Sequence, residues 1–141
     1  MTQPPSDNAP ESPEPRPGER AFRDELLNSM SGGEYMSLSD IDSRIQYDYR
    51  TEPLADRQTR VMTAVSSLLR QGLCVVGDIV GGTGATVDQW KLSTEEALAR
   101  LRELYVGQYD DEDRWGWVVW LALTPEGERV AEEMETRGNS K

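Results

Sequence analysis

Residues 93–134 read STEEALARLRELYVGQYDDEDRWGWVVWLALTPEGERVAEEM, and this segment carries the clearest structural signals in the chain. It opens with a capping box, in which Ser93 can accept a hydrogen bond from the amide of Glu96 while the Glu96 side chain reaches back to the amide of Ser93. Apolar residues then recur on one side of a helix. They are Ala97, Leu98, Leu101, Leu104 and Tyr105. These features predict a helix from Ser93 to Leu104.

The residues after this helix predict a β-hairpin. We expect a short strand at residues 105–109, a polar tip at residues 110–114 and a longer strand at residues 115–123. The longer strand is apolar on both sides, with Trp117 on one side and Trp120 on the other. A strand of this kind is expected to be covered on both faces.

The sequence LTPEG at residues 123–127 predicts the start of the last helix. Its threonine suits the N-cap, its proline suits the first helical position and its glutamate suits the first turn. Val130 and Met134 lie four residues apart and indicate the buried face of this helix.

The segment is similar to the second half of winged-helix domains, and more narrowly to the multiple-antibiotic-resistance regulator (MarR) type. In that family a recognition helix runs into a β-hairpin wing with an acidic-x-Arg tip, and the second wing strand ends in a Leu-Thr-x-x-Gly turn. The matching pieces here are residues 93–104, 111–114 and 123–127. The resemblance covers residues 56–135 in the order of elements and residues 93–134 by motif. It implies a winged-helix fold, DNA binding and, as is usual in the family, a dimer.

The chain before this segment predicts further helices and one strand. Apolar spacing indicates helices at residues 19–30, 39–47 and 54–71, the last of them closed by a glycine. Residues 73–80 are apolar and largely β-branched, and they predict a strand. Residues 81–92 are glycine-rich and indicate an irregular connector, where the family has a short support helix.

Together these elements predict an α+β fold in several parts. Residues 54–136 form a winged-helix-like core of helix, strand, helix, β-hairpin and helix, preceded by a short helical extension at residues 18–53. Residues 1–17 hold six prolines and no Val, Ile, Leu or aromatic side chain, so they predict a disordered tail. Residues 137–141 are expected to fray.

Composition excludes several functional classes. The chain has 141 residues, 15 Lys and Arg against 26 Asp and Glu, no His and one Cys, with a formal net charge of −11. The lack of His excludes imidazole base catalysis and most zinc sites, and a single Cys excludes an internal disulfide. We therefore expect no metal, no cofactor and no enzymatic activity. An enzymatic alternative would need carboxylates that converge near Asp78 in a closed pocket.

The sequence also bears on location. No apolar run approaches the ~18 residues that a membrane helix needs, and the N-terminal sequence lacks the basic and apolar regions of a secretory signal. Cys74 lies in an apolar stretch, which fits a reducing compartment. We expect a protein without membrane segments, located in the cytoplasm.

The acidic balance argues against nucleic-acid binding. The predicted recognition helix has Glu95 and Glu96 in its first turn, where a helix that reads DNA presents basic or amide side chains. A degenerate winged-helix transcriptional regulator is the alternative interpretation. Its DNA-binding residues would be Arg100, Arg102 and Arg114, which would have to converge on one basic face.

The preferred interpretation is a non-enzymatic, acidic protein-binding module with a basic protein as partner. One form of it is an immunity or inhibitor protein that neutralises a basic toxin or nuclease. The predicted contact residues are aromatic and acidic. They are Tyr105, Tyr109, Asp110, Asp111, Glu112, Asp113, Trp115, Trp117 and Trp120. Trp is enriched at interface hot spots, and core packing is the other role open to these rings. A homodimer through the N-terminal helices or the last helix also stays open.

Overall fold

The fold is an α+β arrangement of helices and an antiparallel sheet. The computed structural model describes residues 17–81 and 85–139, so that residues 1–16, 82–84 and 140–141, which include nearly all of the predicted tail, lie outside the described residues. The elements follow in this order: α1 (Pro17–Met30), β1 (Met36–Ser37), α2 (Leu38–Asp48), α3 (Leu54–Arg70), β2 (Cys74–Val80), β3 (Thr86–Gln89), α4 (Thr94–Arg102), the π-helical segment η2 (Glu103–Gly107), α5 (Glu112–Trp115), β4 (Trp120–Leu123) and α6 (Pro125–Asn139).

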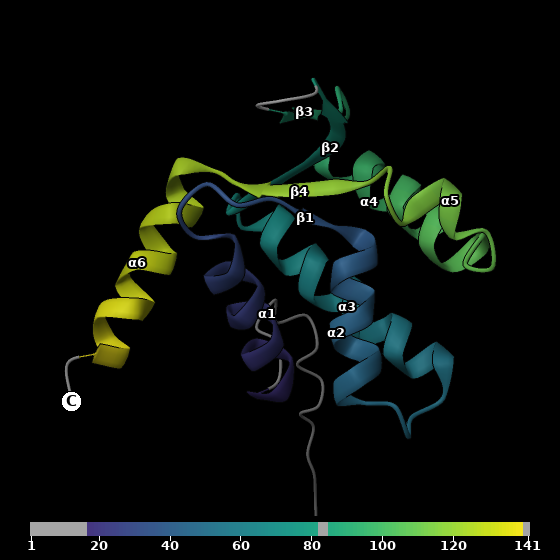
Figure 1. Ribbon diagram of the computed structural model, residues 1–141, viewed down its shortest axis with the longest axis horizontal. Helices are drawn as coiled ribbons and strands as arrows, with labels where there is room; N and C mark the ends of the chain where they lie inside the picture. The colour runs from purple at the N-terminus through teal and green to yellow at the C-terminus, as the bar shows by residue number, and fades with distance from the viewer. Residues whose placement is uncertain (1–16, 82–84, 140–141) are drawn as a thin grey trace, which may run out of the picture.

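The sheet has the strand order β1-β4-β2-β3, and each pair of neighbours is antiparallel. β2 is staggered, because its first half pairs with β4 and its second half pairs with β3. Helices α1, α2 and α3 lie on one side of β1 and β4, and among the described residues no helix covers the other side (Figure 1). One face of the sheet therefore points to the core and the other points outward.

A single hydrophobic core joins the N-terminal helices to the rest of the described chain. Leu26 of α1 and Ile41 of α2 belong to the same buried cluster as Val65 of α3 and Leu121 of β4. β1 also pairs with β4. The segment predicted as a helical extension, residues 18–53, thus contributes to the same core as the elements that follow it.

Helix α3 ends as its sequence predicts. Gly72 has a φ of +72°, a left-handed conformation that favours glycine. Its amide donates to the Leu69 carbonyl at 3.1 Å, and the Leu73 amide donates to the Leu68 carbonyl at 2.9 Å. This pair of bonds is a Schellman motif, and it turns the chain directly into β2.

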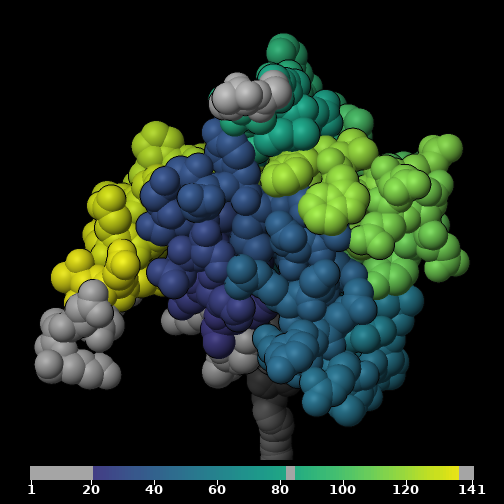
Figure 2. Space-filling view, in the orientation of Figure 1, coloured from purple at the N-terminus to yellow at the C-terminus, as the bar shows by residue number. Residues whose placement is uncertain are grey.

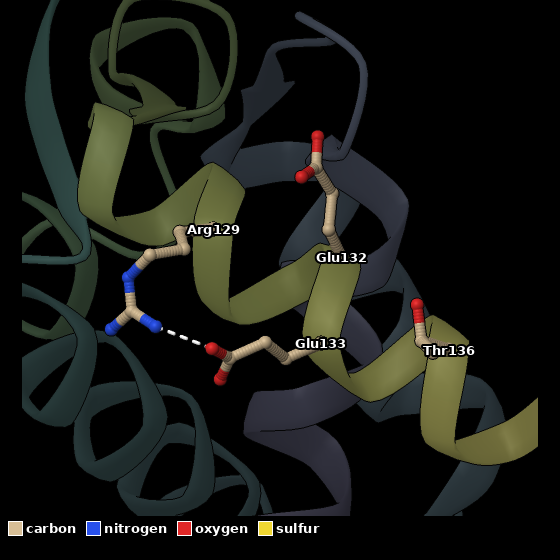
Figure 3. Close-up of a pocket in the computed structure, with 4 residues that line it drawn as sticks. All are labelled: Arg129, Glu132, Glu133 and Thr136. Carbon is tan, nitrogen blue, oxygen red and sulfur yellow. Dashed lines mark hydrogen bonds and ion pairs between the residues drawn. The ribbon is translucent and has the colours of Figure 1, made fainter.

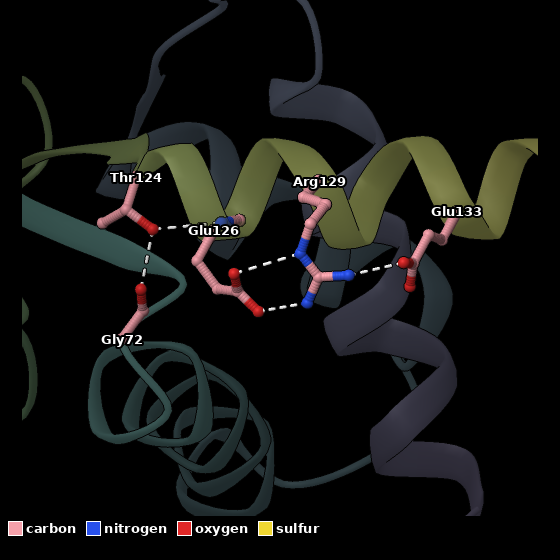
Figure 4. A network of polar contacts seen from close by, with 6 residues as sticks. Gly72, Thr124, Glu126, Arg129 and Glu133 are labelled. Carbon is pink, nitrogen blue, oxygen red and sulfur yellow. Dashed lines mark hydrogen bonds and ion pairs between the residues drawn. The ribbon is translucent and has the colours of Figure 1, made fainter.

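The LTPEG turn ties the start of α6 to the end of α3 (Figure 4). The Thr124 hydroxyl donates to the Gly72 carbonyl at 2.7 Å and accepts from the Gly127 amide at 3.0 Å, which confirms Thr124 as the cap. A Cβ on Gly127 would lie 2.0 Å from the carbonyl oxygen of Leu73. Glycine at this position therefore lets α6 pack directly against the backbone that precedes β2.

The ends of the described chain differ slightly from the prediction. Pro17, assigned to the tail, is the first residue of α1, where proline fits because the first helical amides lack partners. α6 begins at Pro125 as predicted and continues to Asn139, past residue 137 where fraying was expected. No helix among the described residues is long and apolar enough to cross a membrane.

The hairpin predicted at residues 105–123 is wrong in its first part. Residues 105–109, predicted as a strand, lie in η2 and the turn after it. The predicted tip and the start of the longer strand form the short helix α5, so that β4 begins only at Trp120. The physical reason is burial, because the helical path carries Tyr105 and Trp115 into the core. Large aromatic side chains remove the most apolar surface from water there and therefore contribute the most stabilisation.

The irregular connector predicted at residues 81–92 is also wrong, because it contains β3. β2 and β3 form a hairpin in which Ile79 lies opposite Val87 and Val80 lies opposite Thr86. Gly81 has a φ of +86° and permits the change of direction at the end of β2. The short strand Thr86–Gln89 is supported by its pairing with β2 rather than by its own apolar content, which is why its composition indicated a loop.

Candidate functional site

The structure divides the predicted contact residues into an internal and an external group. Tyr105 and Trp115 are buried, Tyr109 and Trp120 are half-buried, and Trp117 is exposed. The four acidic residues at positions 110–113 are all exposed. Only the half-buried and exposed members can touch a partner, and the buried ones support them from inside.

Tyr105, Tyr109 and Trp115 form an aromatic cluster beneath the surface. The Tyr105 ring meets the rings of Trp115 and Tyr109 edge-on, with centroids 5.0 and 5.6 Å apart, and the Tyr109 and Trp115 rings stack at 5.3 Å. The Trp115 indole N–H donates to the Tyr109 carbonyl at 3.0 Å. This packing fixes the path of the chain between η2 and α5.

Asp42 is the polar centre of the aromatic cluster, and the sequence analysis gave it no such role. Its side chain is buried, with 3 % of its surface exposed. The Tyr105 hydroxyl and the Gln46 amide donate to the Asp42 carboxyl, and the Tyr109 hydroxyl donates to it at 2.9 Å. Its spacing of one residue from Ile41 and three from Ile45, both buried, is the sequence signal that places it on the inner face of α2.

The environment of this cluster keeps both tyrosines protonated. Burial raises the pKa of Tyr105 far above its usual value, and the hydrogen bond and negative charge of Asp42 raise it further. Burial and the same carboxyl raise the pKa of Tyr109 to about 12. Both hydroxyls therefore act as hydrogen-bond donors, and the cluster is a structural support rather than a source of base chemistry.

Trp117 and Val118 form the exposed apolar part of the site. These two residues keep 56 % and 41 % of their surface exposed. The Trp120 indole N–H donates to the Trp117 carbonyl at 2.8 Å, which fixes the turn that presents Trp117. In Figure 2 the yellow-green residues at the start of β4 lie in the middle of one face, beside the blue of α2.

The exposed carboxylates at residues 110–113, which we call the acidic turn, precede this apolar part. The turn is fastened to α2, because the Ser39 amide donates to the Gly116 carbonyl at 3.0 Å and the Ser39 hydroxyl donates to Glu112 Oε2 at 2.7 Å. Arg114 forms an ion pair with Asp111 at 3.0 Å. The acidic turn is therefore held against α2.

The outward face of the sheet continues the site, and the sequence analysis missed it. Opposite residues in paired strands point to the same face, so the register places one set of apolar side chains there. This open sheet face consists of Val75, Ile79, Val87, Trp120 and Ala122, all half-buried. The prediction that β4 is covered on both faces is therefore wrong. The sequence signal was Val75 and Ile79, which lie four positions apart in β2 and therefore point to the same face.

The arginines of the DNA-binding alternative come from two helices, Arg100 and Arg102 from α4 and Arg114 from α5. The Arg100 guanidinium lies over the Trp90 ring, 4.2 Å from its centroid, and Arg114 pairs with Asp111. Arg102 is exposed in the last turn of α4. In the first turn of α4, the side-chain hydrogen bond from Arg70 lowers the pKa of Glu95 below its usual value.

Asp78 has a structural partner. Its carboxyl accepts a hydrogen bond from the Trp90 indole at 3.0 Å. Trp90 and the buried Cys74 line a small cavity of about 40 Å³, and burial raises the pKa of the Cys74 thiol to about 12. Within residues 17–81 and 85–139, no group of three or more His, Cys, Asp or Glu side chains is arranged to hold a metal ion.

A surface hollow of about 390 Å³ lies along α6, lined by Arg129, Glu132, Glu133 and Thr136 (Figure 3). Arg129 forms ion pairs with both Glu126 and Glu133 (Figure 4). The hydrogen bond from Arg129 also lowers the pKa of Glu126. The guanidinium group of Arg129 is thus already neutralised, and the lining side chains from the described residues all belong to α6.

Comparison with known proteins gives no relative: no family model matches the chain, and no curated protein and no solved structure is significantly similar to it. The fold and the site define the chain as a small acidic α+β protein. Its distinctive feature is an exposed aromatic and acidic surface around Trp117.

Proposed function

We propose that this chain is a non-enzymatic, acidic protein-binding module that docks a basic protein through Trp117, Val118 and the acidic turn. The observation that carries the proposal is Trp117, a residue with 56 % of its surface exposed that follows four exposed carboxylates by four positions. Covering a large, water-exposed apolar ring with a partner lowers the free energy and so stabilises the complex. An aromatic anchor with a polar rim is also the usual composition of an interface hot spot.

Charge supports a basic partner over a second copy of the chain. The formal net charge is −11, so two copies would repel each other at this surface. The arginines on the described surface are largely paired with carboxylates of the same molecule, as in Arg44 with Glu25 and Arg60 with Glu52. The excess carboxylates are therefore left to attract a partner, which favours fast association with a cationic protein.

An immunity or inhibitor protein for a basic toxin or nuclease is the specific form of this proposal. A nuclease holds phosphate with cationic groups, and an acidic surface can cover those groups in place of the nucleic acid. The single buried thiol suits a reducing compartment, so we place this activity in the cytoplasm as part of the same proposal.

The test uses the purified chain against each basic protein encoded beside its gene, with binding measured by titration calorimetry. We expect one such protein to bind, with an affinity that falls as salt rises from 0.05 to 0.5 M. Trp117→Ala should weaken binding by roughly 30-fold or more, as truncation of a hot-spot Trp does. If the partner is an enzyme, its activity should be lost when it is bound.

Tyr47→Ala is the matched control for Trp117→Ala. Tyr47 is also an exposed aromatic residue, with 74 % of its surface exposed, but it lies near the end of α2. Its removal should leave the affinity for the partner within about twofold of that of the unchanged chain. The proposal fails if no basic neighbour binds, or if the Trp117 and Tyr47 variants bind equally well.

We also propose a winged-helix relationship with a new assignment of its elements. The order α1, β1, α2, α3, β2 and β4, and the sheet order β1-β4-β2, support it, because a winged helix has a short strand after its first helix that pairs with the last strand of the wing. In this assignment α2 and α3 are the helix-turn-helix, and β3 to α5 are an insertion between the wing strands. The recognition helix would then be α3 and not residues 93–104.

This order of elements is the observation that favours the alternative function, a degenerate DNA-binding regulator. Against it, two of the three arginines of α3 are engaged elsewhere. Arg60 pairs with Glu52 and lies over the Tyr49 ring, and Arg70 pairs with Glu95. We expect no shift of a 30-base-pair duplex by the chain in 50 mM salt. A shift that disappears at higher salt would favour the regulator.

A further inference from the structure

The staggered strand β2 has an open edge near the proposed docking surface. Its pairing with β4 ends at Gly77, which lies opposite Trp120, whereas its pairing with β3 continues to Val80. Residues 116–118 form a turn, so the chain does not continue the line of β4 beside the end of β2. Asp78, Ile79 and Val80 therefore pair on one side only.

The hydrogen bonds on either side of β2 show which backbone groups point to the open edge. The Val76 carbonyl accepts from the Trp90 amide on the β3 side, and the Leu73 carbonyl accepts from the Thr124 amide on the β4 side. Successive residues of an antiparallel strand direct their N–H and C=O groups to opposite sides. Ile79 therefore presents both groups to the β4 side, where the described residues provide no partner strand.

We propose that an extended basic segment of the partner adds to this edge as a β-strand, in the place that β4 leaves free beside Ile79. The inference rests on the proposed function and specifies how the partner binds. Strand addition uses main-chain hydrogen bonds for affinity and alternate side chains for specificity. An open strand edge is otherwise a site that proteins keep covered or charged.

The side chains around this edge suit a strand of alternating basic and apolar residues. Ile79 and Trp120 belong to the open sheet face, on which the apolar side chains of an added strand would lie. Asp88 is exposed beside Asp78 on the other face. The Trp120 indole also bonds the Trp117 carbonyl, so the added strand would run next to the exposed aromatic anchor.

The experiment titrates the full chain into a fluorescent peptide of sequence Lys-Val-Lys-Val-Lys-Val-Lys and follows anisotropy. We expect saturable binding that is at least tenfold weaker for the same peptide with an N-methyl group on every amide, and absent for the peptide in which Glu replaces Lys. Equal binding of the N-methylated peptide would overturn strand addition, because that peptide keeps its charge but lacks the amide donors on both edges.

Two variants locate the edge. Ile79→Pro removes the N–H that points to the open side and should weaken peptide binding about threefold to tenfold, the effect of one hydrogen bond. Val87→Pro is the matched control, because the Val87 N–H points away from β2, to the outer edge of β3. If Val87→Pro weakens binding and Ile79→Pro does not, the strand adds to β3 and the proposal is wrong.

Amide exchange of the unchanged chain gives a readout that does not depend on how the variants fold. Saturation with the Lys-Val peptide should slow hydrogen exchange at Ile79, and an unchanged exchange rate there would overturn the proposal. Failure of strand addition is distinguishable from failure of the proposed function. A basic partner protein whose binding depends on Trp117, together with no protection at Ile79, leaves docking intact and removes strand addition alone.

Discussion

Asp42 supports the candidate site from the interior of the protein, although it is not one of the exposed residues of that site. It is buried in α2, yet its carboxyl accepts hydrogen bonds from Tyr105 in η2 and from Tyr109 before α5. The acidic turn and Trp117 follow these tyrosines directly in the chain. The position of Trp117 and the acidic turn therefore depends on a buried polar group that is more than 60 residues away from Tyr105 in sequence.

Replacing Asp42 with Asn should destabilise the protein strongly. The amide retains one oxygen acceptor and places an NH2 group among the hydroxyl and amide donors, so buried donors lose their partners. We expect the free energy of unfolding to fall by about 2–4 kcal/mol, measured by urea denaturation. Asp40→Asn, the same change at an exposed site in the first turn of α2, should cost about 0.5 kcal/mol. Equal losses in the two variants would contradict this account.

Cys74 predicts how stability changes with alkaline pH. Burial raises the pKa of its thiol from 9.0 to about 12, so the folded protein keeps this proton above pH 9 while the unfolded chain loses it. Stability is therefore full below pH 9 and falls as the pH rises, and the raised pKa values of Tyr105 and Tyr109 extend the fall above pH 10. Between pH 9 and 10 the thiol should account for a loss of about 1 kcal/mol.

The Cys74→Ala variant isolates this effect. Its free energy of unfolding at pH 7 will differ from that of the unchanged chain because a buried side chain is smaller. The relevant quantity is the change from pH 9 to pH 10, which should be clearly smaller in the variant than in the unchanged chain. The same decrease in both proteins would show that the thiol is not the group that titrates.

At the scale of single elements, the LTPEG turn connects a sequence motif to a close backbone contact. Gly127 lies in the first turns of α6, where alanine normally favours the helix by about 1 kcal/mol. Here a Cβ would lie 2.0 Å from the Leu73 carbonyl oxygen, so Gly127→Ala should instead destabilise the protein by about 3 kcal/mol. The melting temperature and urea midpoint of the variant measure this loss.

Gly107→Ala provides the matched control for Gly127→Ala. A Cβ at Gly107 would meet no heavy atom within 4 Å, and its φ is not positive. The same glycine-to-alanine change should therefore leave stability within about 0.5 kcal/mol, as at an ordinary surface position. A stable Gly127→Ala protein would mean that α6 can move away from Leu73 at little cost.

The elements that the sequence predicts correctly are those whose structure is determined by residues close together in the chain. The α3 helix with its Schellman end, the capping box at Ser93 and the cap at Thr124 are confirmed, because each depends on residues within a few positions of each other. β3 depends on its pairing with β2, and η2 depends on the burial of Tyr105 against Asp42. These long-range contacts leave no local signal, so residues 81–92 and 105–115 were predicted wrongly.

The same limit applies to the candidate site. The sequence identified Trp117 and the acidic turn as contact residues, and both are exposed. It could not separate them from Tyr105 and Trp115, because an aromatic residue has the same composition signal in a core and at an interface. The open sheet face required the strand register, which places Val75, Ile79 and Trp120 on one side.

At the scale of the whole molecule, the core runs across the predicted boundary between residues 53 and 54. Buried apolar side chains from the first three elements make up a large part of it. They are Phe22, Leu26, Leu27, Met30, Met36, Leu38, Ile41 and Ile45. Full burial of one such side chain contributes about 1.5–3 kcal/mol, and a domain is stable by only about 5–15 kcal/mol in total. The elements from α3 onward therefore depend on α1, β1 and α2.

This dependence predicts the behaviour of two fragments. A fragment of residues 54–139 lacks β1, one of the two partner strands of β4, and all of the side chains just named, so it should show no cooperative unfolding transition and should bind hydrophobic dyes. A fragment of residues 17–139 retains the described core and should unfold cooperatively, with a urea midpoint close to that of the full chain. If the shorter fragment also unfolds cooperatively, α3 to α6 form an independent domain and α1 and α2 are an extension of it. That result would contradict the winged-helix assignment, in which α2 and α3 belong to one helix-turn-helix.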